Sequence, residues 1–422
     1  MNKAEIMTKK HDKKCSLAPR LRFPEFRDEW YSQALGAIAS IIKEKAGNKK
    51  CTLMSIMTGV GLISQIDKFG KEIAGNQYKN YIILRNNDFA YNKSATKDYP
   101  QGFIALYTGS GIAAVPNSIF TCFKVQQKII VPAYLNYLFL GNFHGKWLRR
   151  YITVGARAHG SLSIDDDDLL SLPIPYPKGV SSLGEQQKIA DCLSSLDERI
   201  AAETTKLDRL KDHKNGLLKQ LFPTEGETLP QLRFPEFRNA GEWEINLLGQ
   251  ISENLDNRRV PITENMRIRG AIPYYGASGI VDYVNGFIFD EELLCISEDG
   301  ANLIARTAPI AFSISGKSWV NNHAHVLKFS SRARQKLIEE YINFIKIDDF
   351  LTGMAQPKLN KAKLEVIPIP IPLTEKEEQK IVDCLSSLDE LIAAQTQKID
   401  LLNEHKKGLM QQLFPRIDEV LA

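Results

Sequence analysis

A long internal repeat constrains this chain of 422 residues more than any other feature. Residues 188–223 and 380–415 are identical at 25 of 36 positions, and both copies end in Gln-Leu-Phe-Pro. The heptapeptide Leu-Arg-Phe-Pro-Glu-Phe-Arg begins at Leu21 and again at Leu232, and Glu-Trp follows it shortly both times. We call these two heptapeptides the Phe-Pro boxes. Repeats of this kind indicate that one structural unit is built twice within the chain.

Between box and repeated helix the two halves differ. Tyr31–Leu172 and Glu244–Ile367 share no evident alignment, although each leads into an alternating proline run that must be extended. The order of the segments is also circular. The first helix leads directly into the second box, and the box expected after the second helix is supplied by the N-terminus. We therefore expect a pseudo-two-fold internal repeat. The predicted domains are an N-terminal tail (1–20), a first variable domain (21–177), a first spacer helix (178–223), a linker (224–231), a second variable domain (232–372), and a second spacer helix with the C-terminal tail (373–422).

The repeated segments have apolar residues at spacings of three and four, which predict long helices with a heptad seam. Both seams are interrupted by polar residues at matching positions, Glu203 with Gln395 and Lys214 with Lys406. Helices of about 50 Å are not stable alone in water, so we expect the two to pair, and two-fold closure makes the pair antiparallel. The alternative is that each helix packs only on its own variable domain. The seam residues are Ile189, Leu193, Leu196, Ile200, Leu207, Leu210, Ile381, Leu385, Leu388, Ile392, Ile399 and Leu402.

Charge separates the helices from the rest of the chain. The net charge is +4, but residues 185–222 carry no net charge and residues 377–414 carry −3, which leaves +7 elsewhere. The helices are therefore predicted to be a spacer with protein partners, and the variable domains to be the phosphate-binding parts. No apolar stretch is long enough to span a membrane, and the Lys-rich N-terminus lacks an apolar signal region, so we expect a cytoplasmic protein. The six cysteines are widely spaced and are expected to be plain thiols.

The variable domains mix short β-rich runs with Gly, Asn and Asp turns, and the fold class expected is α+β. Predicted strands include Tyr81–Leu84, Ile104–Tyr107 and Val326–Phe329, and predicted helices are Ala133–Tyr151 and Ala333–Ile345. Residue types suited to phosphates and base edges lie in the connecting segments, although scattered basic loop residues also occur on ordinary surfaces. The DNA-binding candidates are Lys79, Tyr81, Arg85, Asn92, Lys93, Lys97, Arg157, Arg258, Arg259, Arg267, Arg269, Tyr274, Tyr275, Lys317 and Asn321.

Signatures of catalysis are mostly absent. The segment ending Gly316-Lys317-Ser318 resembles a phosphate loop, but Ala311 stands where the first glycine is required. His323 and His325 could bind a metal, but no further ligand is evident, and a structural role is favoured. The acidic run Asp165–Asp168 could bind a cation, but a solvated turn or helix start is favoured. We therefore predict no catalytic residue, no metal site and no bound cofactor in this chain.

Two dissimilar domains with repeated helices, the Phe-Pro boxes and the terminal Gln-Leu-Phe-Pro closely resemble the DNA-specificity subunit of type I restriction-modification systems. The motifs Glu185-Gln186-Gln187-Lys188-Ile189 and Glu377-Glu378-Gln379-Lys380-Ile381 add to the likeness, which spans nearly the whole chain. The resemblance implies two target-recognition domains, each reading one half of a bipartite DNA target. It also implies that the antiparallel coiled coil sets the unread gap and docks two methyltransferase subunits.

By the same resemblance, catalysis belongs to partner subunits in a host-defence system. The methyltransferases use S-adenosylmethionine to modify adenine N6, and a motor-nuclease subunit uses ATP and Mg²⁺ to restrict unmodified DNA. Rival interpretations are an adaptor whose two domains bind protein or RNA, and an autonomous nuclease. The Phe-Pro boxes are interpreted as local packing that anchors a domain to a helix end, in preference to a docking site for the methyltransferase.

Overall fold

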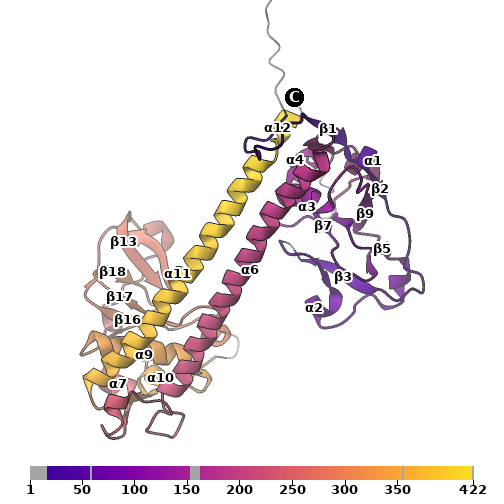
Figure 1. Ribbon diagram of the computed structural model, residues 1–422. Helices are drawn as coiled ribbons and strands as arrows, with labels where there is room; N and C mark the ends of the chain where they lie inside the picture. Colours follow the sequence, from indigo (N-terminus) through magenta and orange to yellow (C-terminus); the bar gives the residue numbers. More distant parts are fainter. Residues whose placement is uncertain (1–16, 58, 153–161, 354–355, 421–422) are drawn as a thin grey trace, which may run out of the picture. The chain divides into compact units, whose positions relative to one another are not determined.

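The computed structural model describes residues 17–57, 59–152, 162–353 and 356–420, and Figure 1 labels their helices and strands. The chain divides into two compact units. The first unit comprises the chain up to residue 202 together with residues from 398 onward, and the second comprises residues 203–397. Both long helices cross this division, so each unit contains a part of each helix. Within the described ranges, no helix is long and apolar enough to cross a membrane.

The two repeated segments form the longest helices of the described chain. They are α6, Ser182–Leu221, and α11, Glu375–Leu413, with 40 and 39 residues. In the first unit, Leu193 near the start of α6 shares a core with Leu413 at the end of α11. In the second unit, Leu221 at the end of α6 shares a core with Leu385 near the start of α11. The helices therefore run antiparallel within each unit, as the repeat predicts.

The predicted seam lies on the less exposed face of both helices. Ile189, Leu193, Leu207, Ile381, Leu385 and Leu388 are buried, and Leu196, Ile200, Leu210, Ile392, Ile399 and Leu402 are half-buried. The polar interruption Gln395 is also buried, and its side-chain amide donates to the Glu203 carboxylate at 2.8 Å. The two polar interruptions that match in sequence thus bond to one another.

The seam lysines form equivalent ion pairs in the two units. Lys406 of α11 pairs with Asp197 of α6 in the first unit, and Lys214 of α6 pairs with Asp389 of α11 at 2.7 Å in the second. Each ion pair has an additional partner from its domain: the Tyr137 hydroxyl donates to Asp197 in the first unit, and Glu340 pairs with Lys214 at 2.8 Å in the second. The shared pairs follow the repeat, and the additional partners differ because the domains differ.

An arginine of each Phe-Pro box is hydrogen-bonded to a glutamate at the start of the long helix that follows its domain. The Arg22 guanidinium makes a two-point contact with Glu185 at 2.7 and 2.8 Å, and Arg233 makes the same contact with Glu377. The indole N–H of the tryptophan after each box donates to the same carboxylate at 3.3 Å. Both glutamates are buried, so these are shielded, charge-assisted hydrogen bonds.

The same boxes also contact the end of the other helix. The Leu21 N–H donates to the Gln412 carbonyl of α11 at 3.0 Å, and the Leu232 N–H donates to the Gln220 carbonyl of α6 at 2.8 Å. The N-terminal box thus has the same bond at the end of α11 that the second box has at the end of α6. The circular order expected from the sequence is present in these contacts.

The described residues of the first domain form two four-stranded sheets and one two-stranded sheet. The sheet orders are β2-β9-β6-β7, β4-β3-β8-β5 and β1-β10, and all pairs are antiparallel except β3 with β8. The proline run forms β10, which is extended as expected. The elements are β1 Trp30–Ala34, α1 Leu35–Ile38, β2 Ala39–Ile41, β3 Thr52–Met57, β4 Gly61–Ser64, α2 Gln65–Phe69, η1 Gly75–Asn80, β5 Ile82–Leu84, β6 Asp88–Asn92, β7 Phe103–Leu106, β8 Ala113–Val115, β9 Phe120–Val125, α3 Pro132–Leu140, α4 Phe143–Leu148, α5 Asp166–Leu170 and β10 Pro173–Pro177.

The second domain repeats this topology. Its sheet orders are β12-β19-β16-β17, β14-β13-β18-β15 and β11-β20, with β13 and β18 parallel. Both variable regions therefore have the mixed helix and strand content that the sequence predicts, and they share a strand order that their sequences do not reveal. The elements are η2 Pro235–Phe237, β11 Glu244–Leu247, α7 Leu248–Ile251, β12 Glu253–Asn254, η3 Asp256–Arg258, η4 Glu264–Met266, β13 Arg269–Gly276, β14 Gly279–Val284, β15 Phe289–Asp290, β16 Leu293–Ser297, α8 Asn302–Ala305, β17 Ala311–Ile314, β18 Lys317–Val320, β19 Ala324–Lys328, α9 Arg332–Phe344, η5 Asp348–Phe350, α10 Lys361–Glu365 and β20 Pro368–Ile371; α12, Ile417–Val420, follows α11 in the first unit.

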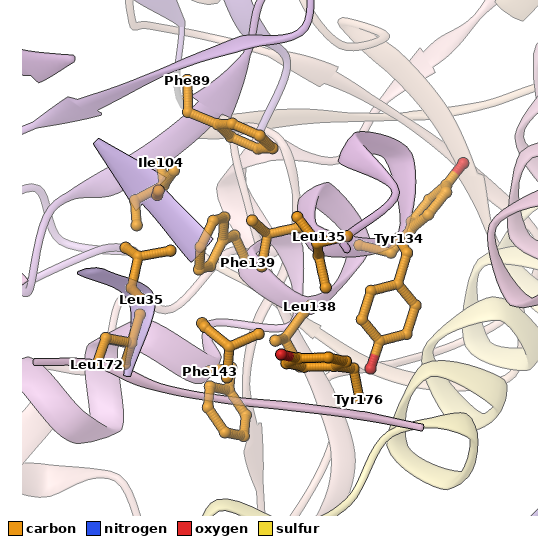
Figure 2. Packing of buried hydrophobic residues seen from close by; sticks show 14 of the residues in the cluster. Leu35, Phe89, Ile104, Tyr134, Leu135, Leu138, Phe139, Phe143, Leu172 and Tyr176 are labelled. Carbon is orange, nitrogen blue, oxygen red and sulfur yellow. The ribbon is translucent and has the colours of Figure 1, made fainter. Parts of the chain in front are cut away.

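The core of the first domain lies where α3 covers a sheet. Phe89 and Phe123 stack at 5.1 Å between ring centroids, and Phe139 of α3 meets Phe89 edge-on at 5.7 Å. Figure 2 shows Phe139 and Leu135 of α3 in the same core as Phe89 and Ile104 of the sheet. The helix predicted over 133–151 is interrupted after α3, because Asn142 takes a left-handed conformation (φ 56°) before α4 begins. In the second domain the predicted helix is continuous, as α9.

Candidate nucleic-acid interface

Loops next to corresponding strands meet at one edge of each domain, which we call the loop edge. In the first domain the Lys93 N–H donates to the Ile119 carbonyl at 2.8 Å, and in the second the Glu298 N–H donates to the His323 carbonyl at 2.9 Å. Lys93 and Glu298 therefore occupy corresponding positions. The first loop edge comprises residues 93–102 and 116–119, and the second comprises residues 277–278, 298–301 and 321–323.

Three first-domain candidates lie at or beside the first loop edge. Lys97 is exposed and Lys93 is half-buried. Asn92, at the end of β6, is only 7% exposed, and its side-chain oxygen accepts from the Ser94 N–H at 3.0 Å. Asn92 thus orders the turn that carries the two lysines.

The other first-domain candidates are grouped elsewhere. Carbonyls of Lys79 and Tyr81 accept hydrogen bonds from the loop after β2, and Arg85 pairs with Glu44 of that loop at 2.7 Å. Hydrogen bonds from Arg85 and Lys49 lower the pKa of Glu44 to about 2. Arg157 lies outside the described residues.

In the second domain, Tyr275 and Asn321 are brought together next to the loop edge. The Asn321 N–H donates to the Tyr275 carbonyl at 3.0 Å, and the Asn321 side chain accepts from the His323 N–H at 2.8 Å. The Ser297 hydroxyl donates to the Ala277 carbonyl, which joins the end of β16 to the turn after β13. These bonds connect the turn after β13 to the end of β16 and to the loop before β19.

The remaining second-domain candidates are spread over other surfaces. Tyr274 is 1% exposed, and its ring supports the Arg267 guanidinium at 4.6 Å. Arg258 lies over Phe289, and Lys317 lies 4.8 Å from the Phe287 ring. Arg269 is exposed at the start of β13. The DNA contacts expected of all these residues stay predictions.

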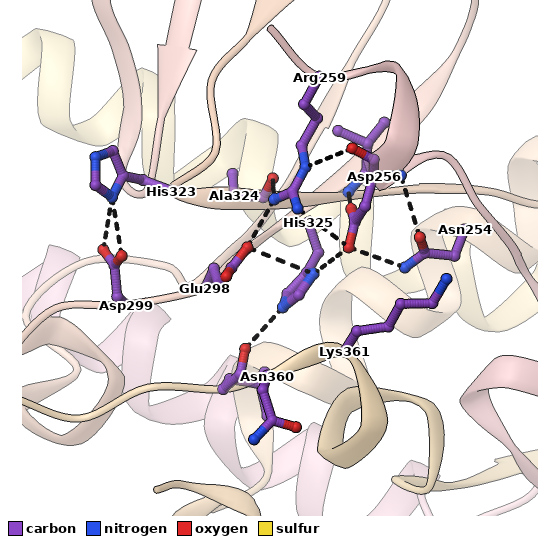
Figure 3. A network of polar contacts seen from close by, with 12 residues as sticks. Asn254, Asp256, Arg259, Glu298, Asp299, His323, Ala324, His325, Asn360 and Lys361 are labelled. Atoms are coloured by element: carbon purple, nitrogen blue, oxygen red, sulfur yellow. Dashed lines mark hydrogen bonds and ion pairs between the residues drawn. The ribbon is translucent and has the colours of Figure 1, made fainter. Parts of the chain in front are cut away.

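A polar network around the buried His325 lies next to the second loop edge (Figure 3). Arg259 donates to the Glu298 carboxylate at 2.7 Å and to the Ala324 carbonyl at 2.8 Å. Asp256 accepts from His325 at 2.6 Å. Burial is the largest single influence on the pKa values of Asp256 and Glu298 and raises both. The hydrogen bonds and charges of His325, Arg259 and their neighbours together outweigh it, so both pKa values lie below their ordinary values. The network contains two carboxylates that are held in charged form.

The interpretation of the histidines as structural residues fits this network. His325 is 1% exposed, whereas His323 is about half exposed and pairs with Asp299 at 2.9 Å. Within the described ranges, no cluster of three His, Cys, Asp or Glu side chains could hold a metal ion. The acidic run behaves as a helix start, because Asp165 caps α5. The described cysteines are free thiols, and Cys15 lies outside the described residues.

Sequence reasoning missed several residues of these sites. Asp256 and Glu298 lie 69 and 27 positions before His325, and no local motif links them. The pairing of Arg22 with Glu185 was also missed, although the recurrence of both residues in the second repeat was a usable signal.

Comparison with known proteins follows the same division of the chain. Residues 28–212 and 240–404 both match the type I restriction modification DNA specificity domain. The chain belongs to this family. Each match covers one variable domain and most of the long helix that follows it, so the chain carries two DNA specificity domains.

Curated relatives and solved structures agree with this assignment. A putative type I restriction enzyme specificity subunit of Haemophilus influenzae is 36% identical over 151 residues, which are 35% of this chain and 39% of that protein. The putative MjaX specificity subunit of Methanocaldococcus jannaschii is 26% identical over 333 residues, 74% of each chain. The crystal structure of an S subunit from M. genitalium, 14% identical, has a TM-score of 0.57 and covers 94% of this chain and 99% of its own. That likeness shows the fold.

Proposed function

We propose that this chain is the sequence-recognition subunit of a type I restriction-modification complex, and that each variable domain reads one half of a bipartite DNA target through its loop edge. The observation that carries the proposal is that the two domains have the same strand order but different side chains at their loop edges. The backbone bonds are the same, but Lys93 stands where the second domain has Glu298.

The chemistry of the two edges supports different base preferences. Lysine neutralises phosphates and donates to guanine, whereas carboxylates accept from the cytosine amino group. The first loop edge carries Lys93 and Lys97, and the second carries Asp299 beside His323. The two halves of the target would therefore differ in sequence, and a protein–DNA complex would be oriented on an asymmetric site.

The antiparallel helices suit the role of a spacer between the two readers. At about 1.5 Å per residue, each helix is about 60 Å long, compared with about 34–36 Å for one turn of DNA. They would set the number of unread base pairs and dock two methyltransferase subunits. Adenine N6 methylation with S-adenosylmethionine, and restriction with ATP and Mg²⁺ by a motor-nuclease subunit, would be performed by those partners, and this chain would be non-catalytic.

The test is to co-express the chain with the methyltransferase encoded beside it in a host without DNA methylation, and to map modified adenines by long-read sequencing. The expected result is one split motif with a fixed unread gap. Random or absent methylation, in a complex shown to be assembled and loaded with S-adenosylmethionine, would contradict the proposal and favour the adaptor alternative.

A further inference from the structure

His325 holds an unusual place at the beginning of β19. Its Nδ1 lies 2.6 Å from the Asp256 carboxylate, and its Nε2 lies 2.7 Å from the Leu359 carbonyl. Both neighbours are acceptors. A neutral imidazole has one N–H, whereas an imidazolium has two, so this geometry fits a ring that is protonated at both nitrogens. With one partner at each ring nitrogen, the buried His325 ring connects two parts of the chain.

The connector joins backbone segments that are far apart in sequence. Asp256 belongs to η3 and also accepts from the Val326 N–H at 2.9 Å. The Leu359 N–H donates to the Glu298 carbonyl at 2.8 Å, and Lys358 pairs with the Glu298 carboxylate at 3.2 Å. The segment around residue 359 is thereby fixed both to β19 and to the loop edge.

Arg259 closes the network from the other side. Its guanidinium bonds to Glu298 and to the Ala324 carbonyl, and lies 3.5 Å from Asp256. As Figure 3 shows, His325 and Arg259 lie between the carboxylates of Asp256 and Glu298. The side chains of Arg259, His325 and Asp256 thus set the position of Glu298, from which the loop edge continues.

The first domain has different residues at the matching positions. The Leu162 N–H donates to the Lys93 carbonyl at 2.8 Å, as Leu359 does to Glu298, so the backbone arrangement is the same. The strand register places Thr121 at the position of His325, and Thr121 donates to Asp166 at 3.2 Å. Its short hydroxyl cannot bond at two opposite ends as the imidazole does.

We infer that His325 is a positioning residue for DNA reading by the second domain, and that it sets the accuracy of one half-site only. His325 acts through Asp256, Leu359 and Glu298, which hold the second loop edge against base edges. The inference rests on the proposed function. Because a bidentate base contact loses strength when its geometry is displaced, loosening this edge should relax the base preference without abolishing phosphate contacts.

The test is the methylated motif of the complex containing His325→Gln. Glutamine retains a donor group but cannot reach acceptors at both ends as the imidazole does. We expect selectivity to fall about tenfold at one or two base pairs of the half read by the second domain, with the other half and the unread gap unchanged. The half is assigned by exchanging residues 244–367 for another recognition domain. Thr121→Ala is the matched control in the first domain, and it should leave both halves as they are.

The outcomes separate this inference from the proposed function. If the wild-type complex gives no split motif, the proposed function fails. If the wild-type motif is split but His325→Gln only lowers the thermal midpoint and leaves the motif unchanged, or relaxes both halves, the inference is wrong.

Two further measurements apply if His325→Gln does not fold. Lys358→Ala, at an exposed side chain, should cause a smaller relaxation of the same half, and an unchanged motif would overturn the inference. In wild-type protein with ¹⁵N-labelled histidine, both ring nitrogens of His325 should take part in hydrogen bonds. A ring nitrogen without a hydrogen bond would contradict the role of His325 as a connector.

Discussion

The two copies of the contact between a Phe-Pro box and the start of a long helix, which we call the junctions, have the same side chains, whereas the two loop edges have different ones. At the junctions, the same residue types make the same contacts twice: Arg22 forms an ion pair with Glu185, and Arg233 forms one with Glu377. At the loop edges, the same backbone bonds carry different side chains, Lys93 in one domain and Glu298 in the other. Repeated side chains therefore mark what both units must do alike, and repeated topology with different side chains marks where the units act separately.

Breaking a junction should produce the largest loss of stability. Arg22→Ala or Arg233→Ala leaves a buried carboxylate without its partner, which typically costs about 3–5 kcal/mol. The loss should be at least as large for Arg233, which is 8% exposed, as for Arg22, which is 19% exposed. Calorimetric unfolding of the full chain measures both.

The boxes supply their own control. Arg27 and Arg238 are exposed and occupy the last position of each box. Their replacement by alanine should change stability by less than about 0.5 kcal/mol. Equal losses of stability for all four arginine variants would mean that the ion pairs Arg22–Glu185 and Arg233–Glu377 are not the stabilising contacts.

The seam lysines sharpen the comparison, because their shared contact is the same and their additional contact differs. Lys214→Ala should cost about 2 kcal/mol, since both Glu340 and Asp389 lose their partner, and Lys406→Ala should cost about 1 kcal/mol, since Asp197 keeps the Tyr137 hydroxyl. Thermal unfolding of the two variants compares the two losses of stability. A larger loss for Lys406→Ala than for Lys214→Ala would contradict the prediction.

The loss in Lys214→Ala should also depend on pH. Burial raises the pKa of Glu340, and Lys214 opposes this rise. A carboxyl whose folded pKa is raised contributes most at low pH, and this contribution is lost as the carboxylate forms. Without Lys214, the destabilisation should therefore grow as the pH rises above the ordinary glutamate value of 4.5. A loss independent of pH would show that the lysine acts through packing alone.

A small effect is expected where the starts of the two long helices differ. Glu378 corresponds to Gln186, whose amide bonds to Ile129, Val131 and Ser182. Burial raises the pKa of Glu378, although Arg334 opposes this. Glu378→Gln removes the ion pair but also a buried charge, so the net change at neutral pH should be within about 1 kcal/mol. Urea unfolding would contradict this if the loss exceeded 3 kcal/mol.

The repeat made the helices and their pairing predictable, because identical apolar positions at heptad spacing must find equivalent surfaces. It also located the polar interruptions Lys214 and Lys406, but not their partners Asp389 and Asp197, because those lie on the opposite helix. The shared strand order of the two domains could not be predicted. It depends on the alternation of apolar and polar residues and on turns, which different sequences can provide. The break at Asn142 was missed because the apolar pattern continues across it.

The candidate DNA contacts could be predicted only as residue types. Asn92, Asn321 and Tyr274 fit a base-reading pattern in sequence, yet all three are buried and bond to neighbouring backbone. Burial of a loop residue depends on segments far away in the chain, so local composition cannot reveal it. His325 illustrates the converse, since its partners Asp256 and Leu359 come from distant turns.

The central claim is that each domain reads its own half of one DNA target. The most direct test exchanges residues 31–172 for a recognition domain of different specificity and maps methylated adenines in the assembled complex. The account predicts that one half of the motif changes while the other half and the junction contacts are retained. A change in both halves would contradict it.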